Sequence, residues 1–307
     1  MLAVVNTPTQ KSPVELREVA EPEANEREAL VAVRAFSLNR GELSLLASRP
    51  EGWRPGQDIT GIVVQRAANG SGPEVGTRVI GLAEQGGWAQ RVAVATDRLA
   101  VLPEQISFTQ AAAVPMAGST ALRLLRLGGS LLGKRVLITG AAGGVGGFAV
   151  QLAALAGAHV TGVVGRPERA AGLRELGAHE IVTSIEQASG PFEVILESVG
   201  GASLTAALRV VAPHGDVIVF GNSSGEDTPF SLFQLFGHEG MRLQTFFSYA
   251  PGTPQTLSAD LATLLTLMAE GKLKAPVGME TNWRELVSAL GALHERQVQG
   301  KAVFVVE

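Results

Sequence analysis

A glycine-rich turn between two apolar segments constrains the fold of this chain more than any other feature. The stretch VLITGAAGGVGG runs from Val136 to Gly147. The residues before it are typical of a buried parallel strand, and GFAVQLAALAGA after it is typical of a helix closed by glycine. Free N–H groups and the helix dipole at such a helix N-terminus attract a pyrophosphate. The glycine spacing differs from G-x-G-x-x-G, so a plain bend between buried elements is the alternative reading.

Strands and helices alternate on both sides of this turn. The pattern predicts strands over 136–140, 158–164, 179–183, 192–196 and 215–221, with helices over 144–156, 167–176 and 202–212. Such alternation indicates right-handed βαβ units in a doubly wound parallel sheet.

The regions on either side of this segment have a different pattern. Residues 1–110 contain strand-like runs such as EALVAVRAFSL and ITGIVVQRA, with few helical signals. Helices with a proline break are predicted over 109–129. After about residue 248 we expect two helices, TLSADLATLLTLMAEGKL and WRELVSALGALHERQV, and a closing strand, KAVFVVE. These elements have no βαβ partner, so we expect them to pack on the first region.

Composition narrows the classes of function. Net charge is −4 with no basic block, which argues against a nucleic-acid or membrane partner. The chain has no cysteine, which excludes disulfides and thiolate zinc sites and fits a cytoplasmic protein. Its N-terminus is predicted to be a strand and not a signal peptide. Residues 136–165 carry no formal charge, but their central glycines favour a buried strand–turn–helix–strand over a membrane span.

The end of the second predicted strand indicates which dinucleotide is bound. An NAD site usually has Asp or Glu there, to bind the adenosine ribose. Here Gly165 and Arg166 end the strand and Arg169 follows. Two cations without an acid favour a 2′-phosphate, and so NADPH, although both arginines are also compatible with solvated helix-start residues.

Several motifs together resemble the zinc-free quinone oxidoreductases, the zeta-crystallin-like group of the medium-chain dehydrogenase/reductase superfamily. The similar stretches are GAAGGVG, PGQDITGIVV, GGWAQRVAV, AAAVPMAGSTAL, RAAGLRELGAHEIV, ESVGG, VIVFGNSSG and GKAVFVVE. They cover nearly the whole chain in order. The resemblance implies an α/β fold with a GroES-like, partly open β-barrel substrate domain over 1–112 and 249–307. It also implies a Rossmann NADP-binding domain over 113–248, cofactor and substrate in the cleft between the two domains, and a homodimer.

The resemblance also bears on metal binding. It places Asn39, Gln57 and Met116 where zinc-dependent relatives hold their metal, and Asp58 where those relatives have a supporting acid. The histidines at 159, 179, 214, 238 and 294 are scattered along the sequence and include no close pair. We therefore expect no metal site, and we leave open whether Asp58 is a turn carboxylate or a substrate contact.

The resemblance assigns candidate roles at the nicotinamide end of the cofactor. Asn39 and Asn222 can donate hydrogen bonds without a change of charge, and Thr120 can brace the nicotinamide ring. Related enoyl reductases carry a tyrosine near the position of Arg40, and the only tyrosine here, Tyr249, lies in a turn-like stretch. The expected catalytic residues are Asn39, Thr120 and Asn222, without an assigned proton donor. The expected cofactor-binding residues are Gly140, Ala142, Gly143, Gly144, Val145, Gly165, Arg166, Arg169, Ser198, Val199, Gly221, Asn222, Ser223, Phe246 and Phe247. For the two phenylalanines, core packing is the alternative.

Three functions are compatible with these features. The first is a zinc-independent transfer of a hydride from NADPH to a quinone or another activated alkene or carbonyl, which tolerates the charge it gains. The second is an enoyl-thioester reductase of the polyketide type. The third is a non-catalytic NADPH-binding protein.

Overall fold

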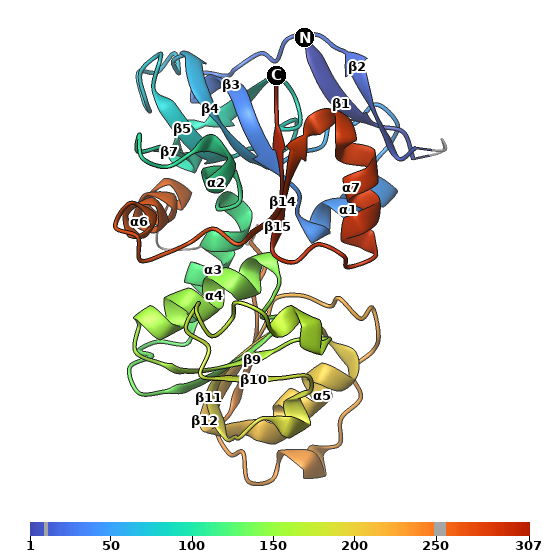
Figure 1. Ribbon diagram of the computed structural model, residues 1–307, viewed down its shortest axis with the longest axis vertical. Coiled ribbons are helices and arrows are strands. Elements are labelled where there is room, and N and C mark those ends of the chain that lie inside the picture. The colour runs from blue at the N-terminus through green and yellow to red at the C-terminus, as the bar shows by residue number, and fades with distance from the viewer. Residues whose placement is uncertain (9–11, 249–255) are drawn as a thin grey trace. The chain divides into compact units, whose positions relative to one another are not determined.

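The computed structural model describes residues 1–8, 12–248 and 256–307 and divides into two compact units (Figure 1). Unit 1 comprises Met1–Ser119 and Thr253–Glu307, and unit 2 comprises Thr120–Gly252. The first and last parts of the chain therefore belong to one unit. The functions expected for the two domains, with boundaries at 112 and 249, stay predictions.

Unit 2 is built on a parallel sheet with the strand order β10-β9-β8-β11-β12-β13 in its described residues. Numbered from β8, this is the 3-2-1-4-5-6 order of doubly wound dinucleotide-binding sheets. Helix α4 packs on β8 and β9, and α5 packs on β11 and β12. The strands are β8 (Arg135–Thr139), β9 (His159–Val163), β10 (Glu180–Val182), β11 (Phe192–Glu197), β12 (Val211–Val219) and β13 (Arg242–Thr245). The longer helices are α3 (Pro115–Leu127), which begins in unit 1 and ends in unit 2, α4 (Gly144–Leu155) and α5 (Gly201–Val210).

Burial explains why this part of the sequence is apolar without strict alternation. In β8 every residue from Val136 to Thr139 is buried, because helices or turns cover both faces of a parallel sheet. Helix α4 is buried from Gly146 to Ala153, which accounts for its lack of charged residues. The long uncharged stretch is therefore the interior of this unit. In the part of the chain that the structure describes, no helix is long and apolar enough to cross a membrane.

Unit 1 is built on a mixed sheet with the order β14-β15-β3-β4-β5-β7, and β6 pairs with β3. A separate antiparallel pair joins β1 and β2. Together with the parallel sheet of unit 2, this confirms the predicted α/β fold class. The strands are β1 (Leu2–Asn6), β2 (Val14–Glu18), β3 (Glu28–Ser37), β4 (Asp58–Gln65), β5 (Arg78–Leu82), β6 (Arg91–Ala95), β7 (Leu99–Val101), β14 (Val277–Asn282) and β15 (Lys301–Val305).

Helices of unit 1 cover its sheet at separate places. Helix α6 (Leu257–Ala269) contacts β5 and β7, α2 (Phe108–Ala112) contacts β3, β4 and β15, and α1 (Arg40–Ser48) contacts α7 (Leu286–His294) (Figure 1). The main core is aromatic at its centre, where Phe36 stacks on Trp88 and Phe304. The elements from the end of the chain therefore complete the core that the first hundred residues begin.

Several elements differ from the sequence prediction. Residues 167–176 do not form an α-helix: a short 3-10 helix, η2 (Pro167–Ala170), is followed by turns, because Gly172 adopts a φ of +77° that interrupts a helix. Helix α1 and strands β13 and β14 were not predicted. All three are short.

Candidate functional site

The glycine turn joins β8 to α4 at the carboxyl edge of the parallel sheet. Gly140 has a φ of +62°, and the Gly143 N–H donates to its carbonyl at 2.8 Å. A Cβ on Gly146 would lie 2.2 Å from the Gly140 oxygen, so only glycine lets α4 sit this close to the turn. The backbone N–H groups at the start of α4 follow directly on this turn. The geometry fits the pyrophosphate of a dinucleotide.

Glu197 organises the neighbouring loop, and sequence analysis did not identify it. Its carboxylate is fully buried at the end of β11, where it accepts hydrogen bonds from the backbone N–H groups of Val199 and Gly200 and from the Ser203 hydroxyl at 2.8 to 3.2 Å. The only sequence signal was an acid at the end of an apolar strand. Glu197 thereby fixes the backbone of Ser198 and Val199, two of the predicted cofactor contacts.

The predicted segment Gly221, Asn222 and Ser223 lies beside that loop. The Ser223 N–H donates to the Ser198 carbonyl at 3.1 Å, and a Cβ on Gly221 would approach the same oxygen at 3.0 Å. Ser198 in turn donates its N–H to the Thr139 hydroxyl at 2.8 Å. The structure therefore brings together the ends of β8, β11 and β12, the region where ligands bind to sheets of this topology.

Arg166 and Arg169 follow the end of β9 at the same edge of the sheet. Arg166 is exposed, Arg169 is half-buried, and the Arg169 N–H donates to the Arg166 carbonyl at 3.1 Å within η2. A Cβ on Gly165 would meet nothing within 4 Å, so the backbone before the arginines stands in open space. The turn after β9 therefore carries two cations, and the end of the strand carries no acid, at the position where doubly wound sheets bind the adenosine ribose.

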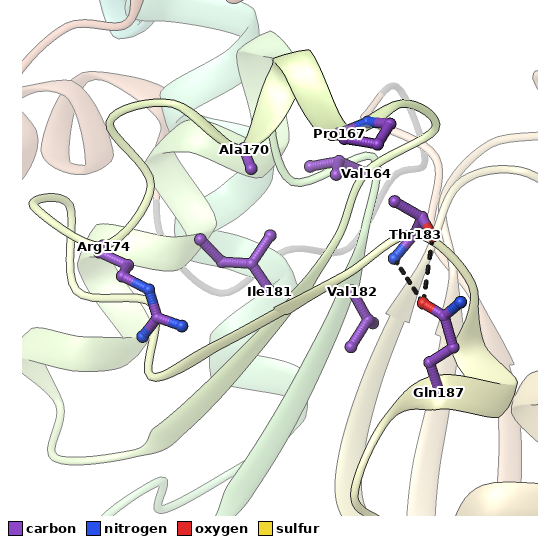
Figure 2. Close-up of a pocket in the computed structure, with 8 residues that line it drawn as sticks. All are labelled: Val164, Pro167, Ala170, Arg174, Ile181, Val182, Thr183 and Gln187. Atoms are coloured by element: carbon purple, nitrogen blue, oxygen red, sulfur yellow. Dashed lines mark hydrogen bonds between the residues drawn. The ribbon is translucent and has the colours of Figure 1, made fainter.

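Two cavities lie in unit 2, and none of the predicted site residues lines either of them, although Val164, Pro167 and Ala170 of the first cavity are sequence neighbours of the predicted contacts. One, of about 300 Å³, lies beside β10 under the turns that replace the predicted helix (Figure 2). Its wall is mostly apolar, with Arg174, Thr183 and Gln187 as polar groups. The other, of about 720 Å³, lies between α5 and residues 226–234. We assign neither of them to the cofactor.

The remaining predicted contacts of unit 2 differ in exposure. Thr120 is buried and its hydroxyl lies 2.9 Å from that of Ser248. Phe246 is buried, whereas Phe247 is 67% exposed, so only the second has a face free for a ligand. Tyr249 lies outside the described residues.

Asn39 lies in unit 1, at the start of α1, within a charged cluster. Its carboxamide bonds to Asp58, the fully buried first residue of β4, and to Lys301, the buried first residue of β15. Glu42, one turn into α1, accepts the Asn39 N–H at 2.7 Å. Burial, reinforced by the nearby charge of Asp58, raises the pKa of the Glu42 carboxyl to about 8, so Glu42 is protonated at neutral pH. Asp58 is thus half of a buried ion pair and lies in a strand, not in a turn.

The residues aligned with zinc ligands do not fit that metal. Structural and catalytic zinc sites use thiolate, imidazole and carboxylate groups, whereas these positions hold the side chains of Asn39, Gln57 and Met116. The Asn39 oxygen is bonded to the Lys301 ammonium, whose charge opposes a divalent cation. Within residues 1–8, 12–248 and 256–307, no cluster of three or more His, Asp or Glu could hold a metal ion.

Two histidines that are distant in the sequence lie close together in the structure. His159 and His179 stack with ring centroids 4.4 Å apart, because parallel strands β9 and β10 begin side by side. A pair separated by twenty positions in the sequence therefore becomes adjacent through strand pairing.

Comparison with known proteins identifies the family. A family model described as zinc-binding dehydrogenase matches residues 144–270. A quinone oxidoreductase of Pseudomonas aeruginosa is 32% identical over 312 residues, with 95% of each chain covered. The spectinabilin polyketide synthase system protein NorB of Streptomyces orinoci is 35% identical over 90% of this chain, but the match spans only 13% of that longer protein. The structure of Escherichia coli quinone oxidoreductase complexed with NADPH has the same fold, with a TM-score of 0.88 at 23% identity and 100% of each chain covered.

Fold, site and relatives agree. The chain joins a GroES-like sheet unit to a doubly wound sheet with a glycine turn at its carboxyl edge, and this combination defines a medium-chain dehydrogenase/reductase. The chain belongs to the zinc-free quinone oxidoreductase group of that superfamily. It is therefore an oxidoreductase of a family that uses a nicotinamide cofactor.

Proposed function

We propose that this protein is a zinc-independent reductase that uses NADPH to reduce a quinone or another activated alkene or carbonyl. The observation that carries the proposal is the carboxyl edge of the sheet in unit 2. There the glycine turn stands at the N-terminus of α4, and two arginines follow β9 where NAD enzymes carry an acid.

The cofactor preference rests on charge. The guanidinium groups of Arg166 and Arg169 suit a dianionic 2′-phosphate, which Arg binds with charge-assisted hydrogen bonds. The backbone of Gly140, Gly143 and Gly144 approaches the pyrophosphate without a side chain in the way, and Ala142 and Val145 complete the turn. The NADPH complex of the E. coli enzyme, which shares this fold, supports the same cofactor.

The remaining chemistry follows from what the chain's own side chains can do. When bound, NADPH supplies the hydride. Asn39 and Asn222 each carry a neutral N–H donor, and a donor of this kind stabilises the negative charge that accumulates on a substrate oxygen in the transition state. Quinones and enones suit this site because their charge spreads onto oxygen without a metal. We propose that Thr120 and Phe247 shape the nicotinamide pocket, with Ser198, Val199, Gly221 and Ser223 along the ribose.

A second candidate is reduction of an enoyl thioester. The NorB relative belongs to a polyketide synthase system, and it is more identical to this chain than the quinone oxidoreductase of P. aeruginosa is. An enoyl reductase needs room for a long acyl carrier and a proton donor. The position at which related enoyl reductases carry a tyrosine is Arg40 here.

Steady-state assays with a panel of quinones, simple enones and an enoyl thioester distinguish these substrates. We expect turnover of quinones or enones with NADPH. Efficient, stereospecific deuterium transfer into the thioester product, together with weak quinone turnover, would replace the first substrate class with the second. Tight NADPH binding without oxidation by any acceptor would indicate a non-catalytic binding protein and contradict both.

We also propose that the protein acts in the cytoplasm as a homodimer without nucleic-acid or membrane partners. Strand β13 is an edge of its sheet in the described residues, and Leu243 on it is 47% exposed. Phe233 and Phe236, just before β13, are 79% and 66% exposed. An unpaired edge beside exposed aromatic side chains is suited to a second copy of the same chain.

A further inference from the structure

The buried ion pair between Lys301 and Asp58 in unit 1 makes more hydrogen bonds than packing alone requires. Strands β15, β3 and β4 are neighbours, and the ends at which Lys301, Ser37 and Asp58 stand lie together. Lys301 is 3% exposed and Asp58 is fully buried. Buried charges are costly unless every donor and acceptor is satisfied, so the partners of this pair show what it is built to hold.

The Lys301 ammonium has three hydrogen atoms, and three acceptors surround it. It donates to the Leu38 carbonyl at 2.7 Å, to Asp58 Oδ2 at 3.0 Å and to Asn39 Oδ1. Two of these three acceptors belong to the segment that leads into α1. The lysine from the last strand of the chain is thus directed at the residue that precedes the first helix.

Asp58 completes the arrangement from the other side. Its Oδ2 accepts from the Asn39 Nδ2 at 2.9 Å and from the Ser37 hydroxyl at 2.6 Å, and its Oδ1 accepts from the Met116 N–H at 2.8 Å. Since Lys301 can only donate and an ionised Asp58 can only accept, the Asn39 carboxamide has one orientation. Its oxygen faces the ammonium and its nitrogen faces the carboxylate.

One hydrogen of the Asn39 amide nitrogen remains for a ligand. Among the described residues Nδ2 donates a single bond, to Asp58, and Asn39 is partly exposed whereas both of its charged partners are buried. The ammonium on Oδ1 also polarises the amide, and hydrogen bonds in a chain strengthen one another. The second Nδ2–H of Asn39 is therefore a donor of fixed direction, on an amide whose oxygen is bonded to the Lys301 ammonium.

We propose that Lys301 is a positioning residue for the reduction and acts through Asn39. With Asp58, it holds the Asn39 amide so that the free N–H bonds to the substrate oxygen that gains negative charge. The Lys301–Asp58 pair thereby orients and polarises the Asn39 amide from both of its ends. This inference rests on the proposed function, because it assigns Asn39 to the substrate oxygen.

A double-mutant cycle tests the coupling. Native protein, Lys301→Met, Asn39→Ala and the combination are assayed with NADPH and a quinone, and NADPH binding is measured separately. Each single variant should lower kcat about 10- to 100-fold, the range for a misplaced or lost donor, with the dissociation constant for NADPH changed less than about twofold. If Lys301 acts through Asn39, adding Lys301→Met to Asn39→Ala should lower kcat by no more than about threefold.

Two further variants distinguish a loss of catalysis from a failure of the protein to fold. Asp58→Asn/Lys301→Met removes both buried charges together, so no ion is left unpaired, and its kcat should fall like that of Lys301→Met. Lys272→Met removes an exposed lysine that pairs with Glu270 in the same unit and should keep native kcat. Thermal unfolding verifies that each variant is folded.

The outcomes separate this inference from the proposed function. Native turnover with multiplicative effects of Lys301→Met and Asn39→Ala, or a folded charge-free variant with native kcat, would overturn the role of Lys301 and leave the function standing. Failure of the native protein to oxidise NADPH with any acceptor would overturn both.

Discussion

At the scale of single residues, burial displaces the pKa of Glu42 far from its ordinary value. Glu42 is buried beside Asp58, and burial raises its pKa to about 8 from an ordinary value of 4.5. Between these two pH values the folded protein holds a proton on Glu42 that the unfolded chain has lost. The stability that Glu42 contributes is therefore fully present below about pH 4.5 and is lost progressively as pH rises to about 8, at about 1.4 kcal/mol per pKa unit.

Glu42→Gln should remove this pH dependence, because the carboxamide has the shape of the protonated acid and cannot ionise. We expect the variant to unfold at a higher temperature than native protein at about pH 9 and at nearly the same temperature at about pH 4, as measured by thermal melts. Glu51→Gln, at an exposed position, is the matched control. An equal difference between Glu42→Gln and native protein at both pH values would show that Glu42 does not titrate as described.

Arg166 belongs to the same scale, because its expected role is a single contact. Arg166→Ala should weaken NADPH binding by about fivefold to tenfold and leave NADH binding nearly unchanged, since only NADPH carries the 2′-phosphate. Titration of both cofactors by fluorescence measures the effect. Arg174→Ala, an exposed arginine of the same segment that bonds to the His179 carbonyl, should change neither. Equal losses for NADPH and NADH would contradict the assignment.

At the scale of elements, the contact between α4 and the glycine turn determines whether the cofactor edge can form. A Cβ on Gly146 would come within 2.2 Å of the Gly140 oxygen and 2.7 Å of the Ala141 Cα, both rigid backbone atoms. Gly146→Ala should therefore displace α4, lower the unfolding temperature and weaken binding of NADPH and NADH alike. Gly291→Ala in α7, where a Cβ meets nothing within 4 Å, should be neutral or stabilise by about 1 kcal/mol. Native-like melting and binding of Gly146→Ala would refute the close-approach argument.

Local pattern predicted the elements that are long or fully buried. The strand at β8, the helix at α4 and the two late helices follow from apolar runs and glycine breaks. The helix predicted over 167–176 was wrong because Gly172, in the middle of a helical pattern, takes a left-handed conformation that a periodicity count ignores.

Some residues of the candidate site could be predicted from the sequence, and others could not. The glycine turn and the arginines after β9 are local features and could be read directly from the sequence. The bonds of Lys301 to Asn39 and Asp58 could not, because they join residues 262 and 243 positions apart through strand pairing. The buried Glu197 was also missed, since its partners are backbone N–H groups that no sequence pattern marks.

At the scale of the whole molecule, the exposed edge β13 and its aromatic neighbours predict a dimer. Sedimentation of the native protein should give twice the chain mass of 31.9 kDa. Leu243→Asp, which places a charge on the edge strand, should shift the population toward monomer, whereas Val287→Asp, at an exposed position of α7, should not. A native monomer at all concentrations would exclude the proposed assembly.

The ratio of kcat/KM for NADPH to that for NADH, with a quinone acceptor, tests most directly whether the protein is an NADPH-dependent reductase. Because of the charge at the end of β9, we expect kcat/KM to be about tenfold or more higher with NADPH than with NADH, even if the protein turns over both cofactors. A preference for NADH would contradict the reading of Arg166 and Arg169. No oxidation of either cofactor by any quinone or enone would contradict the proposed reaction itself.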